Sequence, residues 1–153
     1  MKIKNIRNIF ILLVILLASF FVYTRLRPKI TPSVKIGEAV FKVELARTNE
    51  ERAKGLAGHR PLQDDEGMLF EFDKGTAGAF WMKGMTFPID IIWITDNKIS
   101  YIVENTPIPK PGQGDVDLPV YNPPKPADWV LEINSGLVKK NKIKLDDPVK
   151  IQL

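Results

Sequence analysis

The chain has 153 residues and a formal net charge of +4, and this length suits one domain with an anchor or tail. Six of the 22 basic side chains and no acidic ones lie in residues 1–30, so residues 31–153 carry 16 basic and 18 acidic side chains, a net charge of −2. That balance argues against a nucleic-acid-binding surface. The absence of cysteine excludes disulfides, thiolate nucleophiles and cysteine-ligated metal centres.

The first 30 residues are predicted to be a transmembrane anchor or an uncleaved signal segment. Residues 8–24 contain no charged side chain, and residues 9–23 are almost entirely Ile, Leu, Val and Phe. Seventeen helical residues span about 26 Å, close to the hydrocarbon thickness of a bilayer. The residues after this run are bulky or charged, which disfavours the alternative of a cleaved signal peptide. We therefore expect membrane contact through residues 9–23.

The orientation of this segment follows from the charges on either side of it. Three basic side chains and the α-amino group precede the apolar run, whereas three basic side chains follow it. The positive-inside rule then favours a cytoplasmic N-terminus. We therefore expect a single-pass membrane protein with its C-terminal domain outside the cytoplasm.

Residues 31–153 are expected to form a single domain of short strands. Residues 41–45 alternate between apolar and charged side chains, as a half-buried strand does. Thr48 and Glu51 have the spacing of a capping box, which predicts a short helix over residues 49–56. Asp96-Asn97 predicts a tight hairpin turn. Strands are predicted within residues 33–45 and at residues 68–72, 79–82, 89–95, 98–105, 129–133 and 149–153.

A proline-rich segment interrupts this pattern at residues 106–126. It holds seven of the twelve prolines and two glycines, a composition that excludes a central strand or a helix. A loop this long inside a small domain is functional or a mobile flap. The predicted fold class is therefore mainly β (α+β): a small barrel- or sandwich-like domain with one or two short helices and this loop, behind one transmembrane helix.

Several short motifs occur in an order that resembles a known family. They are Glu51-Arg52, Gly55-Leu56, Gly67-Met68-Leu69-Phe70, Phe80-Trp81-Met82-Lys83, Pro88-Ile89-Asp90, Val130-Leu131-Glu132 and Gly136. In this order they resemble the domain of unknown function 192 family, over roughly residues 36–153. The resemblance implies a compact, mainly β domain behind a signal or anchor segment, and it implies no particular activity.

The segment from Phe80 to Asp90 is the predicted ligand-binding region. Strand alternation places Trp81 and Lys83 on one face, where an aromatic wall beside an ammonium group suits sugars, apolar groups or anions. Asp90 is expected to pair with Lys83 or Arg52, and Tyr121 of the loop is expected to add stacking surface. The structural alternative makes Trp81 a core residue and gives Asp90 backbone amides as partners.

Catalysis would need carboxylates, because the other reactive side chains are few. Glu104, Glu132 and Asp90 are the candidate acids and bases; Glu104 and Glu132 lie in or beside apolar strands, where burial raises a carboxyl pKa. The alternative is that these side chains face solvent or pair with a base. His59 stands alone in a loop, no complete metal-ligand set is present, and no cofactor is expected.

The leading functional hypothesis is a membrane-anchored, extracytoplasmic ligand-binding or scaffolding module, and we favour it over an enzyme. The first alternative is a hydrolase that uses the three carboxylates. The second is a structural partner of another envelope protein, bound through the proline-rich loop. The partners expected from the sequence are thus the membrane and either a small ligand or an envelope protein, without nucleic acid.

Overall fold

A computed structural model describes residues 2–26 and 31–153, and the chain divides into two compact units at residues 30 and 31. The first unit contains helix α1 (Lys2–Leu26), and the side chains of residues 8–24 are exposed. Among the described helices, none has the length and apolar character needed to cross a membrane. Residues 1 and 27–30, which the predicted anchor included, lie outside the described residues.

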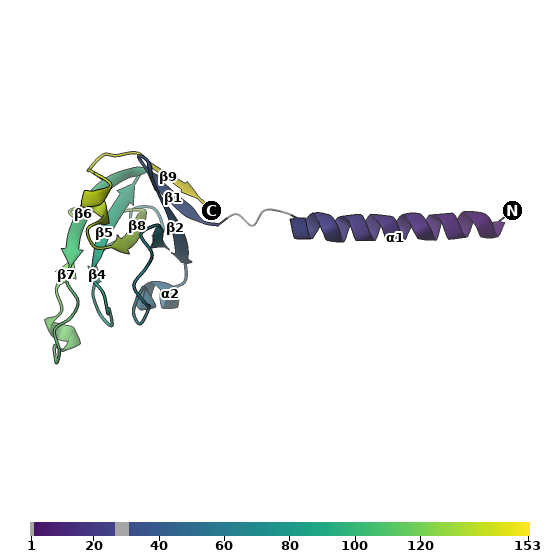
Figure 1. The fold of residues 1–153 in the computed structure, drawn as a ribbon. Coiled ribbons are helices and arrows are strands. Elements are labelled where there is room, and N and C mark those ends of the chain that lie inside the picture. The colour runs from purple at the N-terminus through teal and green to yellow at the C-terminus, as the bar shows by residue number, and fades with distance from the viewer. Residues whose placement is uncertain (1, 27–30) are drawn as a thin grey trace. The chain divides into compact units, whose positions relative to one another are not determined.

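The second unit is built on a seven-stranded sheet, which confirms the mainly β prediction (Figure 1). Its order is β6-β5-β8-β3-β2-β1-β9, and β2 and β3 form its parallel pair. A bridge between Lys98 and Pro148 joins the first residue of β6 to the residue before β9, so the sheet curls into a half-barrel. The strands are β1 (Ser33–Ile36), β2 (Ala39–Ala46), β3 (Glu66–Glu71), β5 (Ile89–Thr95), β6 (Lys98–Thr106), β8 (Trp129–Asn134) and β9 (Val149–Gln152).

The central strands are buried on both faces, because the sheet has an apolar layer on each side. Alternation along β5 sends Ile92 and Ile94 into one core cluster and Ile91 and Trp93 into the other. Helix α3 (Leu137–Lys140) contributes buried residues to the first cluster. The second is covered by residues 77–87 and by Leu56, which follows helix α2. This second layer holds the candidate site.

Helix α2 (Asn49–Lys54) begins as predicted, with Thr48 and Glu51 forming the capping box. It ends at Gly55, whose φ of 49° is a left-handed conformation that favours glycine. A Cβ at this position would lie 3.3 Å from the Phe70 ring, so glycine also allows the helix end to approach β3 closely.

The proline-rich segment is tied to the rest of the domain. It contains the short 3₁₀ helix η1 (Asp115–Asp117) and strand β7 (Val120–Tyr121), which pairs with β4 (Phe80–Trp81) in a separate two-stranded sheet (Figure 1). A bridge between Ala77 and Ala127 joins its far end to the same region. The loop therefore lies beside the segment that carries Trp81 and Lys83.

Candidate functional site

A narrow crevice lies between the end of α2, the segment after β4, and the buried face of β8. Its volume is about 30 Å³. The walls are apolar and include Leu56, Phe70, Phe80 and Met85, while Arg52, Lys54, Trp81 and Lys83 lie around them. The remaining polar side chain is Glu132, which is only 4% exposed. The crevice therefore combines an aromatic and cationic surface with a buried carboxyl group.

Glu132 lies on the face of β8 that carries Val130, opposite Leu131 and Ile133. Its neighbours across the sheet are Met68 on β3 and Ile91 on β5. Its Oε2 atom is completely buried and has no hydrogen-bond partner among the described residues. Burial raises the pKa of this carboxyl group to about 8. Glu132 is therefore mainly protonated at neutral pH.

Trp81 and Lys83 share one face, as strand alternation predicted. The Lys83 Nζ atom lies 5.5 Å from the centre of the Trp81 ring, within the range of a cation–π contact. The same Nζ atom forms an ion pair of 2.6 Å with Asp115 of η1. Trp81 remains 47% exposed, so its ring offers an accessible flat surface. Met82 points the other way and is buried.

Arg52 lies beside the crevice, but its guanidinium group already has several partners. Nη1 donates to the carbonyl oxygens of Arg47 at 2.6 Å and Glu71 at 2.8 Å, and Nη2 donates to Asn49 Oδ1 at 2.6 Å. The guanidinium carbon also lies 5.0 Å from the centre of the Phe72 ring. These contacts hold α2 against the end of β3, so Arg52 contributes mainly positive charge and structure.

Asp90 is buried away from the crevice, and its predicted pairing with Lys83 or Arg52 is wrong. Its Oδ1 atom accepts a hydrogen bond from the backbone N–H of Asn105 at 2.8 Å, and Oδ2 accepts one from Val138 at 2.9 Å. It lies on the face of β5 that carries Ile92 and Ile94, which is the opposite side of the sheet from Glu132. Asp90 thus orders the backbone, as the structural alternative proposed.

The two remaining candidates also lie apart from the buried carboxyl group. Glu104 is exposed on β6, so the three carboxylates do not form a cluster. Tyr121 lies opposite Phe80 in the β4–β7 pair and packs against the second core cluster. Burial raises the pKa of its phenol group. Tyr121 therefore supports the strand that carries Trp81 more than it extends the exposed ring surface.

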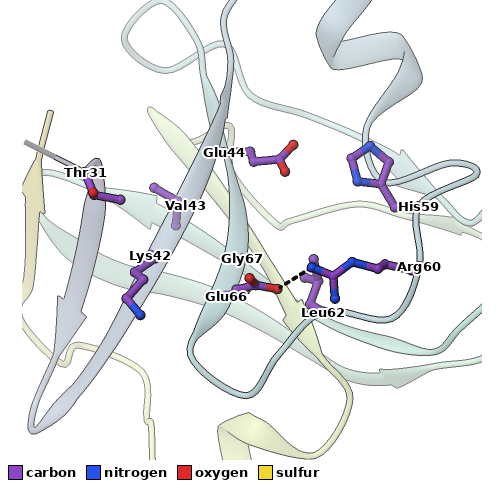
Figure 2. A pocket seen from close by; sticks show the side chains of 9 residues that line it. All are labelled: Thr31, Lys42, Val43, Glu44, His59, Arg60, Leu62, Glu66 and Gly67. Carbon is purple, nitrogen blue, oxygen red and sulfur yellow. Dashed lines mark ion pairs between the residues drawn. The ribbon is translucent and has the colours of Figure 1, made fainter. Parts of the chain in front are cut away.

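A larger groove of about 270 Å³ lies elsewhere in the domain (Figure 2). Its lining is Thr31, Lys42, Val43, Glu44, His59, Arg60, Leu62, Glu66 and Gly67. Arg60 lies 3.9 Å from Glu66, and Lys42 pairs with Asp65 at 2.6 Å, so most of its charges already have partners. No group of three possible metal ligands occurs among the described side chains. Sequence reasoning considered His59 but missed this groove.

We take the smaller crevice as the candidate site because it contains the unpaired buried oxygen. Native proteins leave few buried polar atoms without a partner, and each such atom calls for an explanation. The groove in Figure 2 offers more space, yet it contains no buried polar atom without a partner among the described side chains.

The fold and the site define a small half-barrel β domain in which a carboxyl group is buried beneath a crevice lined by aromatic and basic side chains. The chain belongs to the DUF192 family, described as "Uncharacterized ACR", whose sequence profile matches residues 32–151. This match confirms the family resemblance seen in the sequence motifs. No curated protein matches the chain.

Two solved structures are similar to the chain. One is a protein of unknown function from Novosphingobium aromaticivorans DSM 12444, with a TM-score of 0.67 and 35% identity over 78% of this chain and 82% of that chain. The other, from Sinorhizobium meliloti 1021, is described as a "putative transcription regulator"; it has a TM-score of 0.68 and 26% identity over 81% of this chain and 98% of that chain. The second protein thus consists almost entirely of the matching region.

Proposed function

We propose that the chain is a membrane-attached binding module whose ligand occupies the crevice beside β4 and β7. The observation that carries this proposal is the unpaired, buried Oε2 atom of Glu132. An unsatisfied buried polar atom costs about 1–3 kcal/mol of stability. A ligand group that reaches this atom would remove that cost, and the exposed ring of Trp81 would hold the rest of the ligand.

Binding accounts for these residues better than hydrolysis by carboxylates does. A two-carboxylate hydrolase needs a second acid or base close to the first, about 5–10 Å away. Both oxygens of Asp90 are occupied by backbone N–H groups, and Glu104 is exposed on another strand. Neither of the other two candidate carboxylates is therefore placed to act with Glu132.

A thermal-shift screen of residues 31–153 against sugars, organic acids, peptides, nucleotides and divalent ions tests the binding proposal. This fragment contains both core clusters, and the Sinorhizobium protein shows that a chain of little more than this region forms a folded structure. A ligand that binds the native state raises the midpoint of unfolding. The shift should disappear in Trp81→Ala and remain in Glu104→Gln. A complete screen without any shift would refute a small-ligand site and favour an envelope protein as partner.

Membrane attachment is proposed on the surface chemistry of α1. The side chains of residues 8–24 are exposed and almost all apolar, and the first 30 residues carry six basic and no acidic side chains. Apolar surface of this extent is costly in water, and basic flanks bind anionic lipids. In fractionated cells, the full chain should stay with the membranes after alkaline washing, whereas residues 31–153 should be released. Full release of the complete chain would refute attachment.

The orientation can be tested because the natural chain has no cysteine. Lys144 is exposed in the second unit, so Lys144→Cys introduces a single reactive thiol. A membrane-impermeant maleimide should label this thiol in intact cells if the domain lies outside the cytoplasm. Labelling that requires cell lysis would place the domain inside.

The charge of this domain gives no support to a role in transcription like the one named for the Sinorhizobium protein. Residues 31–153 carry a net charge of −2, and DNA binding depends largely on neutralising phosphates. The charge balance therefore supports a small ligand or a protein as partner.

A further inference from the structure

We infer that the crevice binds the carboxylate group of a small organic acid, with one carboxylate oxygen hydrogen-bonded to the buried carboxyl group of Glu132. This inference rests on the proposed binding function and specifies the chemical class of the ligand. It follows from three properties of the crevice: its size, its charge, and the protonation of its buried acid.

The size of the crevice limits what can reach Glu132. A site needs about 10–15 Å³ to hold one water molecule, and the crevice has about 30 Å³. The crevice therefore has room between its apolar walls for a group about as large as two or three water molecules, such as the carboxylate of a ligand. The body of the ligand must then lie outside, where the exposed ring of Trp81 provides a surface.

The charges around the crevice favour an anion. Arg52 and Lys54 approach from α2, and Lys83 approaches from the segment after β4. Of these cations, Lys83 forms an ion pair with the acidic side chain of Asp115. Lys54 has no ion-pair partner among the described residues, and the strand neighbours of Glu132 are apolar. A cationic rim attracts an anion and repels an ammonium group, whereas a neutral hydroxyl group gains nothing from it.

The protonated state of Glu132 provides the hydrogen bond. A neutral carboxyl group can donate its O–H to a carboxylate oxygen, and such charge-assisted bonds are short and strong. Burial in apolar surroundings keeps Glu132 in this state at neutral pH, since its pKa is about 8. An ionised Glu132 would repel the ligand, so binding should weaken at higher pH.

Two matched sets of probes test the inference on residues 31–153 labelled with 5-fluorotryptophan. The sets are benzoate, benzyl alcohol and benzylamine, and glucuronate, glucose and glucosamine; each compares an acid, a neutral compound and an amine. The chain has three tryptophans, so ¹⁹F spectra report on separate places. Trp81 lies at the crevice, whereas Trp129 packs with the other core cluster and serves as the internal control.

At about pH 6, at least one of the two acids should move the Trp81 signal, with no comparable effect of its neutral or amine counterpart. The dissociation constant should rise about tenfold by about pH 9, as Glu132 loses its proton. Glu132→Gln keeps an N–H donor and should bind without this pH dependence. Glu132→Leu should not bind, and Lys83→Met should bind more weakly while keeping the pH dependence. Glu104→Gln should behave as the natural chain does.

The failures of this inference and of the proposed function can be told apart. If an alcohol or amine moves the Trp81 signal as strongly as its acid, the ligand class is wrong but the crevice still binds. If Glu132→Gln keeps the natural pH dependence, the acid-to-carboxylate bond is refuted. If neither acid moves Trp81 at about pH 6, the inference is overturned, and the thermal-shift screen then decides on the proposed function.

Discussion

Replacing Glu132 with glutamine should stabilise the domain, by an amount that depends on pH. The pKa of the buried carboxyl group is about 8 in the folded protein and 4.5 in an unperturbed glutamate. Between these two pH values the folded state binds one more proton than the unfolded state. The free energy of unfolding of the natural chain should therefore fall by about 1.4 kcal/mol per pH unit in this range.

The magnitude follows from the size of the pKa difference. Below about pH 4.5, Glu132 is protonated in both states and does not lower the free energy of unfolding. As the pH rises from about 4.5 to about 8, the free energy of unfolding falls by a total of about 5 kcal/mol. At pH 7 the loss is about 3 kcal/mol. Glutamine cannot ionise, so the Glu132→Gln variant is spared this loss, and its stability relative to the natural chain should rise by these amounts from about pH 4.5 upward.

Urea unfolding of residues 31–153, followed by tryptophan fluorescence at several pH values between about 5 and 9, measures the effect. The difference in unfolding free energy between Glu132→Gln and the natural chain should increase up to about pH 8 and then remain constant. All other titrating groups are common to the two proteins and cancel in the difference. Glu104→Gln, which removes an exposed carboxylate, should give a curve parallel to that of the natural chain. A difference for Glu132→Gln that stays flat from pH 5 to 8 would refute the raised pKa.

Three further substitutions, two of them with a matched control, test contacts at the end of α2 and within the main sheet. Arg52→Met removes the hydrogen bonds that hold α2 to the end of β3 and should cost about 2 kcal/mol in urea unfolding, whereas Lys54→Met, without an ion pair among the described residues, should cost less than about 0.5 kcal/mol. Asp90→Asn leaves one backbone N–H without its acceptor and should lower stability by about 2–3 kcal/mol, visible as a lower midpoint in thermal unfolding. Gly67→Ala places a Cβ 2.9 Å from the Glu132 carbonyl oxygen and should cost about 1–3 kcal/mol, while Gly78→Ala meets nothing within 4 Å and should be nearly neutral; equal effects would contradict the crowding at β8.

Local sequence patterns predicted those features that depend on residues close together in the sequence. The capping box of Thr48 and Glu51 gave the start of α2, and the alternation at residues 80–83 placed Trp81 and Lys83 on one face. Both features depend on residues that lie within three positions of each other in the sequence. The proline-rich segment was also correctly predicted as a break in the main sheet, since Thr106 ends β6 and no later residue of the segment joins that sheet.

The environment of the carboxylates could not be predicted in the same way. Alternation along β8 puts Glu132 on the face opposite Leu131, and such a face is often exposed to solvent. Here it is covered by Leu56 and Met85, which are far away in sequence. The partner of Asp90 is likewise distant, since Val138 lies 48 residues further along the chain. The sequence indicated three carboxyl groups, and only the tertiary structure separates the buried Glu132 from the exposed Glu104 and the hydrogen-bonded Asp90.

The strand pairing beside the crevice is much shorter than the pairing in the sheet beneath Glu132, which bears on how a ligand reaches a carboxyl group that is 4% exposed. Strands β4 and β7 pair over only two residues each, whereas β5 pairs with β8 over six. The ion pair between Lys83 and Asp115 joins two half-exposed side chains, and pairs of this kind contribute about 0–1 kcal/mol. Local opening is favoured where buried contacts are few. The arrangement thus keeps the acid on a central strand, while the short β4–β7 pairing and the exposed Lys83–Asp115 ion pair add little to the closure of the crevice opening.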